Sequence, residues 1–292
     1  MSSIREVIID KLNGFTNLPS MNETARLVQE QLANGEESQT NAVIIGKIIE
    51  KDLGLSAKIL KIANSVFYSG KYGQIGNVGQ AVARLGIDEV SHICTAVSSI
   101  QLFNDTSGML DLKDFWKHSL GVAIVMRHIA DRAEHMKKYS PNAYTAGLFH
   151  DIGILILDRY YSNIYKVVLE TAKKEPLSLF EIEKNVLGID HGELGALLCK
   201  KWKLPEEICL SVEYHHAPDA CREDFRLLAQ LIHVANFACS ILGIPEPGDN
   251  AIQMASHGAW HDLGLDNCDL NKIAEDVEEG ITRSGVFMSL SL

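Results

Sequence analysis

Residues 146–157 read AGLFHDIGILIL, and this stretch decides how the chain is interpreted. His150 and Asp151 stand side by side in an apolar segment with helical periodicity. Burying an imidazole and a carboxylate among leucines and isoleucines is costly unless both are paired or bind an ion. Adjacent side chains on a helix point about 100° apart, so the two groups would reach one ion from different edges of a cleft. Taken alone, the doublet is more simply interpreted as a hydrogen-bonded polar pair in a core helix.

The flanking sequence predicts helices joined by short loops and shows no strand pattern. Capping residues and prolines mark helix starts, and Gly or Asn marks many ends. Ser56 is expected to cap a helix over 57–64, and one long helix is expected over 112–137. Pro141 is expected to start the helix that carries His150 and Asp151, and Leu270 to Arg283 to form a last amphipathic helix. The predicted fold class is therefore all-α.

A boundary is predicted at Asn104–Gly108, which is short, polar and contains glycine. We therefore expect two lobes, an N-terminal helical lobe over residues 1–108 and a second helical lobe over residues 109–292. At 292 residues the chain is long enough for one large domain or two ordinary ones.

Charge and composition exclude several classes of function. The formal charge is −11, and residues 1–109 carry 9 basic and 11 acidic residues against 18 and 27 in residues 110–292. An acidic chain without a basic stripe argues against nucleic-acid binding. No apolar run approaches the ~18 residues of a membrane span, and the N-terminus does not resemble a signal peptide. The six cysteines contain no CxxC pair, so reduced core cysteines in a cytoplasmic protein are expected.

Further histidines change the interpretation of the doublet. His118, His191 and His215-His216 lie on other predicted helices, and a helix over 224–242 follows them. Imidazole nitrogens suit divalent transition ions such as Fe, Mn, Ni or Zn, and one carboxylate can bridge two ions. Two such ions can clamp a phosphoryl group. The ligand spacing is not that of a compact local motif, so each histidine alone remains open to a core or surface role.

Several segments, in order along the chain, carry a resemblance to a known family. The N-terminal segments are LPSM (18–21), KDLGLSAKILKIANSVFYS (51–69) and NVGQAVARLGIDEV (77–90). The C-terminal segments are FWKHS (115–119), AGLFHDIG (146–153), DHGELGALLCKKWKLP (190–205), HH (215–216) and LIHVANF (231–237). Together they resemble the HDOD branch of the HD superfamily of metal-dependent phosphohydrolases. The resemblance covers essentially the whole chain and implies an N-terminal helical lobe packed on an HD-type lobe.

The resemblance also implies a ligand set for one or two divalent transition metal ions (Fe, Mn, Ni or Zn). The implied metal ligands are His118, His150, Asp151, His191, His215, His216 and Asn236. Asp114 stands where some related HD-GYP phosphodiesterases place an extra carboxylate, and is a candidate to support the ligands.

The sequence differs from the enzymes of the superfamily in two places, and both differences argue against catalysis. Asn236 stands where the superfamily usually has an aspartate, and an amide brings no charge to the ion. Ile154 stands where HD-GYP enzymes place a phosphate-contacting lysine, and the sequence HHAPDA lacks the GYP signature.

Two functions follow as hypotheses. The first is a signalling or regulatory module that keeps a metal pocket and binds a protein partner or a phosphate-containing small ligand without turnover. The second is an active metal-dependent phosphohydrolase or phosphodiesterase that acts on a nucleotide-like phosphate. Neither hypothesis involves nucleic acid or a membrane as a partner.

Overall fold

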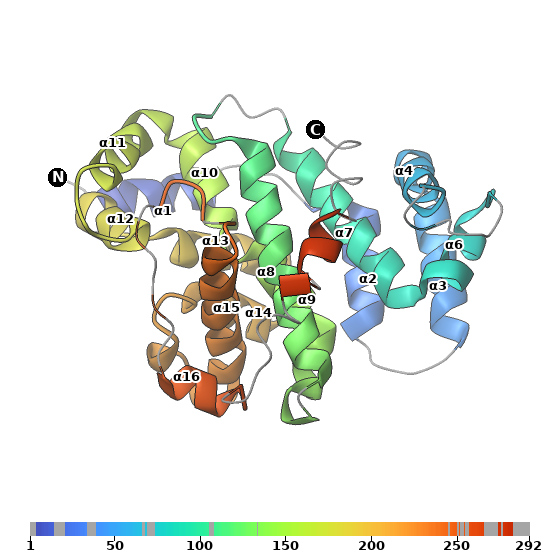
Figure 1. Ribbon diagram of the computed structural model, residues 1–292. Helices are drawn as coiled ribbons and strands as arrows, with labels where there is room; N and C mark the ends of the chain where they lie inside the picture. Colours follow the sequence, from blue (N-terminus) through green and yellow to red (C-terminus); the bar gives the residue numbers. More distant parts are fainter. Residues whose placement is uncertain are drawn as a thin grey trace. The chain divides into compact units, whose positions relative to one another are not determined.

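The structure, a computed structural model, describes residues 4–14, 21–33, 39–65, 68, 74–104, 108–132, 134–244, 246–249, 251, 254, 257–265, 274–275 and 277–282. Every regular element in these ranges is a helix (Figure 1), which confirms the predicted all-α class. None of the helices in the described ranges is long and apolar enough to cross a membrane.

The helices fall into two compact units. The smaller unit comprises residues 19–105 and 281–292, and the larger unit comprises residues 1–18 and 106–280. The chain therefore passes from one unit to the other near the polar segment Asn104–Gly108. Unlike in the expected division at residue 108, helix α1 (Ile4–Gly14) belongs to the larger unit. It is held there because Arg5 pairs with Glu193 at 2.6 Å and Tyr161 donates to the Ile8 carbonyl at 3.0 Å.

The smaller unit is a group of packed helices. Its elements are α2 (Glu23–Ala33), α3 (Gln39–Glu50), α4 (Leu53–Ala63), α6 (Val78–Leu85) and α7 (Ile87–Phe103). Helix α7 packs against the other four. Helix α4 begins earlier than predicted because Asp52, rather than Ser56, caps it by accepting from the Leu55 N–H at 2.9 Å. Ser56 instead donates to the Ile49 carbonyl at 2.9 Å.

The larger unit contains the remaining helices. They are α8 (Leu112–Arg132), η1 (Glu134–Tyr139), α9 (Ser140–Phe149), α10 (Ile152–Tyr160), α11 (Ser162–Ala172), α12 (Leu179–Leu187), α13 (His191–Lys201), α14 (Glu206–Glu213), η2 (Pro218–Ala220), α15 (Glu223–Ile241) and α16 (His257–Asp262). Helix α8 packs against α9 and α15, while α13 packs against α10 and α14 (Figure 1). These contacts surround one buried core.

Two predicted helices are interrupted in this unit. The expected helix over 112–137 ends at Arg132 and is followed by the 3₁₀ helix η1, because the chain must reverse to lay α9 back along α8. The expected continuous helix after Pro141 is also wrong. Helix α9 ends at Phe149 and α10 begins at Ile152, so His150 and Asp151 lie between them as the C-cap of α9 and the N-cap of α10. The His150-Asp151 doublet therefore lies at the junction of α9 and α10.

Glycine allows two helices of the core to approach closely. A Cβ atom at Gly153 would lie 2.0 Å from the His191 carbonyl oxygen and 2.9 Å from the Gly195 backbone nitrogen. Both are backbone atoms, so no side-chain movement relieves the contact. Gly153 therefore brings the start of α10, and with it Asp151, directly against the start of α13 and His191.

The remaining sequence predictions have mixed outcomes. Five cysteines are buried and free, in agreement with the prediction: Cys94, Cys199, Cys209, Cys221 and Cys239. Cys268 lies outside the described residues. The predicted helix from Leu270 to Arg283 is described only at residues 274–275 and 277–282, which are helical.

Candidate metal centre

The larger unit brings six of the predicted ligands together from four helix ends and one helix interior. His118 lies within α8, His150 and Asp151 occupy the α9–α10 junction, His191 opens α13, and His215 and His216 follow α14. Their donor atoms form two groups, each within 4.8 Å: His118 with His150 and Asp151, and Asp151 with His191, His215 and His216. Asp151 belongs to both groups.

Asp151 is at the centre of the cluster. Its carboxylate oxygens lie 3.0 Å from the Nε2 atom of His150, 3.4 Å from that of His191 and 3.5 Å from those of His118 and His215. The side chain is fully buried. Among the described residues, however, neither oxygen has a partner in hydrogen-bond geometry. Four imidazole nitrogens thus converge on a carboxylate that they do not satisfy, as expected of a site built around a cation.

Three histidines have their orientation fixed by main-chain carbonyls. The Nδ1 atom of His118 lies 2.9 Å from the Ile244 oxygen, that of His150 lies 2.7 Å from the Gly147 oxygen, and that of His215 lies 2.7 Å from the Val212 oxygen. A carbonyl only accepts, so each Nδ1 carries a proton and Nε2 is the ring nitrogen left to bind an ion. Metal-binding histidines are held in this way.

His191 is anchored differently, by a carboxylate that the sequence reading missed. Its Nδ1 and its backbone N–H donate to Glu183 Oε2, at 2.7 and 2.8 Å, and Tyr165 donates to Glu183 Oε1 at 3.0 Å. Glu183 is fully buried on α12, on the same stripe as Leu179, Ile182 and Leu187. An acidic residue on an apolar helical stripe is a signal that a sequence reading can use.

The second histidine of the 215–216 doublet is less buried than the first. The Nε2 atom of His216 lies 2.7 Å from that of His191, and its ring stacks on Phe180 with centroids 4.6 Å apart. His233 lies behind the doublet, with its Nδ1 atom 3.0 Å from the His215 carbonyl oxygen. His233 thus supports the backbone of the doublet and is not one of the grouped donors.

The two other predicted site residues differ in their positions. Asn236 on α15 is buried, donates from Nδ2 to Glu246 Oε2 at 3.3 Å, and has an Oδ1 atom without a hydrogen-bond partner in the described part of the chain. Asp114 lies exposed in the first turn of α8 and belongs to neither donor group.

Glu246 is the second carboxylate that the sequence reading missed. It follows α15, only 6% of it is exposed, and its Oε1 atom lies 3.9 Å from His191 Nε2. A glutamate between two prolines in a loop has no periodicity that marks it as buried. The sequence therefore offered no signal for it.

Burial and neighbouring charges shift the pKa values of the titratable groups in the site. Burial lowers the pKa of His118 and of His215 to about 4, so both imidazoles are neutral. Burial opposes a charged His191, yet Glu183 and Asp151 outweigh it and hold the pKa of His191 well above its ordinary value. Burial likewise opposes ionised Asp151, but the imidazoles, His150 first, hold its pKa well below its ordinary value. Burial and the charge of Asp151 raise the pKa of Glu246 well above its ordinary value.

These features fit a metal ion. Neutral imidazoles and a shared carboxylate are a donor set for divalent transition ions, and the unpartnered atoms are those that an ion would satisfy. The buried His/Asp clusters are therefore compatible with a metal site.

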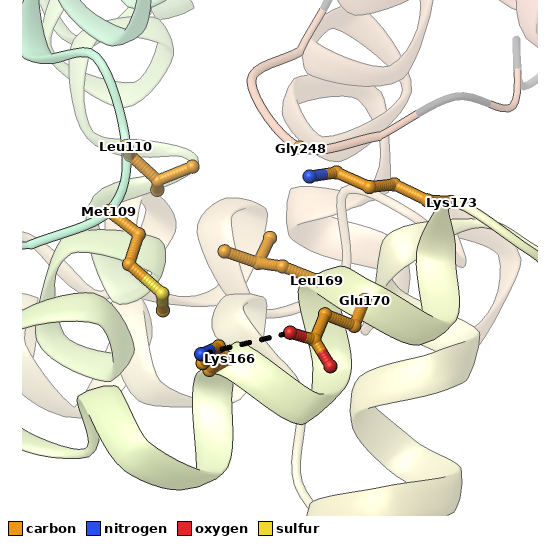
Figure 2. A pocket seen from close by; sticks show the side chains of 7 residues that line it. All are labelled: Met109, Leu110, Lys166, Leu169, Glu170, Lys173 and Gly248. Carbon is orange, nitrogen blue, oxygen red and sulfur yellow. Dashed lines mark ion pairs between the residues drawn. The ribbon is translucent and has the colours of Figure 1, made fainter.

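A surface pocket lies beside the loop that carries Glu246. It has a volume of about 390 Å³ and is lined by Met109, Leu110, Lys166, Leu169, Glu170, Lys173 and Gly248 (Figure 2). Lys166 pairs with Glu170 at 3.9 Å. Gly248 follows Glu246 by two residues, so one loop lines this pocket and also contributes to the buried cluster.

Comparison with solved structures shows the same fold in three bacterial proteins. An HDOD domain protein with unknown function from Geobacter sulfurreducens has a TM-score of 0.79 at 22% identity, over 98% of this chain and 96% of that chain. A candidate signal transduction protein from Marinobacter aquaeolei VT8 has a TM-score of 0.76 at 23% identity, over 100% and 61%. A candidate phosphohydrolase from Shewanella amazonensis SB2B has a TM-score of 0.71 at 22% identity, over 96% and 97%.

Comparison of sequences gives a relative and a family. An uncharacterized protein of Treponema pallidum (strain Nichols) is 22% identical over 235 residues, which are 80% of this chain and 44% of that protein. The chain thus spans less than half the length of this relative. The model of the HDOD domain matches residues 18–218, a range that contains most of the helices and all six residues of the two donor groups. Since this match covers more than half of its length, the chain belongs to the HDOD domain family.

Proposed function

We propose that this chain is an HDOD regulatory module that holds one or two divalent transition ions in its buried pocket and acts by binding, without turnover. One contrast carries the proposal. The imidazoles around Asp151 are oriented as metal ligands, while Ile154, at the position of the expected phosphate-contacting lysine, is a fully buried apolar side chain.

The metal half of the proposal assigns His118, His150 and Asp151 to one ion and Asp151 with His191, His215 and His216 to a second. Bound there, such ions would supply positive charge and Lewis acidity. The protein's own part is to hold the imidazoles in one tautomer, to shield the site from water, and to carry the shared carboxylate.

Burial supports binding without turnover. Five of the donors have no exposed side-chain surface: His118, His150, Asp151, His191 and His215. A bare ion can reach such a site through small fluctuations, but a nucleotide-sized phosphate ester needs an open cleft. Ile154 also stands in place of the expected lysine, so the site lacks a cation that would stabilise the charge developing on a transferred phosphoryl group.

The binding partner that we propose is a protein or a phosphate-containing small ligand. The pocket in Figure 2 supports the second choice, because Lys173 is exposed at its wall and offers a positive charge. The proposed regulatory role favours a protein partner over a small ligand.

A specific observation favours the alternative, an active metal-dependent phosphohydrolase or phosphodiesterase. Asp151 is shared by both donor groups, which is the arrangement needed for a carboxylate that bridges two ions. This alternative requires the buried donors to become accessible to a substrate.

Metal analysis and a turnover assay test the two functions together. Full-length protein purified without chelator is expected to hold one to two transition ions per chain, and Asp151→Asn is expected to hold fewer. With added Mn²⁺ or Fe²⁺, a panel of nucleotide and cyclic dinucleotide phosphates is expected to remain intact. Repeated turnover by the wild type that Asp151→Asn abolishes would establish the hydrolase instead, and a chain that takes up no ion would refute the metal pocket.

A further inference from the structure

We propose that Glu246 is an additional metal ligand, which supplies to the pocket the negative charge that Asn236 does not. This inference rests on the metal-holding role proposed above. It assigns a ligand that belongs neither to the His150-Asp151 doublet nor to the His215-His216 doublet.

The position of Glu246 supports the assignment. Its side chain is almost fully buried and faces the cluster, with Oε1 3.9 Å from His191 Nε2. Within the described chain, Oε1 has no hydrogen-bond partner. Its other oxygen, Oε2, accepts from Asn236 Nδ2 at 3.3 Å, so the amide and the carboxylate stand side by side. The Oδ1 atom of Asn236 is likewise unpartnered in the described residues, so two oxygen donors lie at this edge of the site.

Charge balance gives an independent argument. Asp151 and Glu246 are both buried, and Asp151 Oδ1 and Glu246 Oε1 lie 3.4 and 3.9 Å from the same nitrogen, His191 Nε2. Two neighbouring buried carboxylates are both ionised only when cationic charge lies with them. A divalent ion would supply that charge and would satisfy both oxygens of Asp151 and the Oε1 atom of Glu246, which have no hydrogen-bond partner in the described residues.

The loop that carries Glu246 is fixed at both ends. The Ile244 carbonyl accepts from His118 Nδ1 at 2.9 Å, and the Asp249 carboxylate accepts from the backbone N–H groups of Leu179 at 3.1 Å and Ala251 at 2.8 Å. Glu246 is therefore presented to the cluster by a loop that is already tied to one ligand. A preorganised donor loses little freedom when it binds.

The experiment uses the full-length chain, stripped with chelator and titrated with Mn²⁺. The variants are Glu246→Gln, the control Glu206→Gln, and a double variant that combines Glu246→Gln with Asn236→Asp. Glu206→Gln is a matched control because it makes the same chemical change at an exposed residue of the same unit, which pairs with Arg222 at 3.0 Å and belongs to neither donor group. Readouts are ions bound per chain, the dissociation constant from calorimetry, and the melting temperature with and without Mn²⁺.

We expect Glu246→Gln to lose one bound ion or to bind Mn²⁺ about 10-fold or more weakly, since loss of a residue that only orients a ligand already costs about 10- to 100-fold. Glu206→Gln should bind as the wild type does. The double variant should recover the lost ion, because the Asn236→Asp substitution returns a carboxylate to the neighbouring position.

The outcomes separate this inference from the proposed function. If the wild type binds Mn²⁺ and Glu246→Gln binds it with the same stoichiometry and affinity, Glu246 is not a ligand and the pocket itself stands. A second outcome is that Glu246→Gln binds Mn²⁺ more weakly and the double variant binds no better, although its metal-free melting temperature equals that of the wild type. This outcome would refute the inference that Glu246 supplies the charge that Asn236 lacks. If the wild type takes up no ion, both proposals fail.

Discussion

The Nε2 atoms of His191 and His216 lie 2.7 Å apart, a distance at which one nitrogen must donate a proton to the other. His191 already donates from Nδ1 to Glu183, and its pKa is held well above the ordinary value despite burial. We therefore expect His191 to be protonated in the metal-free protein and to donate from both ring nitrogens. The proton on its Nε2 occupies the position that a metal ion would take.

We expect Mn²⁺ binding to release at least one proton, because His191 must give up its Nε2 proton to act as a ligand. Calorimetric titrations in two buffers of different ionisation enthalpy measure the number released. The affinity should also fall between about pH 8 and pH 6, since protons compete with the ion. Metal uptake without proton release would show that His191 is not a ligand.

The metal-free protein should be most stable near neutral pH. The pKa of His118 and His215 is about 4 in the folded state and ~6.5 in the unfolded state, so unfolding takes up protons between these values. Their contribution to stability is full above about pH 6.5 and is lost as the pH falls, by up to about 1.4 kcal/mol per pH unit for each histidine.

His191 acts in the opposite direction. Its raised pKa makes the folded state bind the extra proton, so its contribution is full below about pH 6.5 and is lost as the pH rises through the raised value. Urea unfolding across the pH range measures both slopes. The raised pKa of Glu246 gives an opposing slope over this range, so the comparison is made in Glu246→Gln. A stability of that variant that is flat between about pH 6.5 and 5 would contradict the neutral state of His118 and His215.

Glu183→Gln should weaken Mn²⁺ binding by about 10- to 100-fold, because the carboxylate that orients His191 and increases its basicity is lost. Gln keeps a similar shape and an acceptor oxygen, so folding should be retained. Tyr165→Phe is the matched control: it removes the hydrogen bond to Glu183 Oε1 but leaves the carboxylate in place. Equal affinities in Glu183→Gln and the wild type would remove Glu183 from the site.

Gly153→Ala should destabilise the protein by about 3 kcal/mol or more, because the added methyl group meets backbone atoms of His191 and Gly195 that cannot move independently. Gly46→Ala is the control, since a Cβ there meets nothing within 4 Å and α3 should gain about 0.5–1 kcal/mol. Urea unfolding measures both. A neutral Gly153→Ala would mean that α10 and α13 can separate at little cost.

Local rules predicted much of the helical framework. Asn77 and Asp190, residue types that favour the N-cap position, accept from the N–H groups of Gln80 and Glu193 at 2.8 Å. Ser178 and Glu181, three residues apart, form a capping box. These features depend on residues within a few positions of one another, so the sequence alone contains them.

The break at His150 could not be read from the same rules. The segment 146–157 keeps an unbroken apolar pattern without proline, and the interruption is imposed by packing of α9 on α8 and of α10 on α13. Glu246 was missed for a similar reason, because its burial depends on a loop that returns to α8 through the Ile244 carbonyl. The seven predicted metal ligands stay predictions until an ion is measured, although the structure places six of them in two donor groups.

The way the imidazoles are anchored has a consequence for how the pocket tolerates mutation. His118, His150 and His215 each take their orientation from a main-chain oxygen, and every amino acid supplies the same oxygen. Substitutions at Ile244 or Val212 can therefore change the side chain without changing the tautomer of a ligand. Of the four fully buried histidines, His191 is the one whose Nδ1 atom is held by a side chain, Glu183. The geometry of this candidate site therefore depends largely on the path of the backbone, so many substitutions around it should leave the orientation of the imidazoles unchanged.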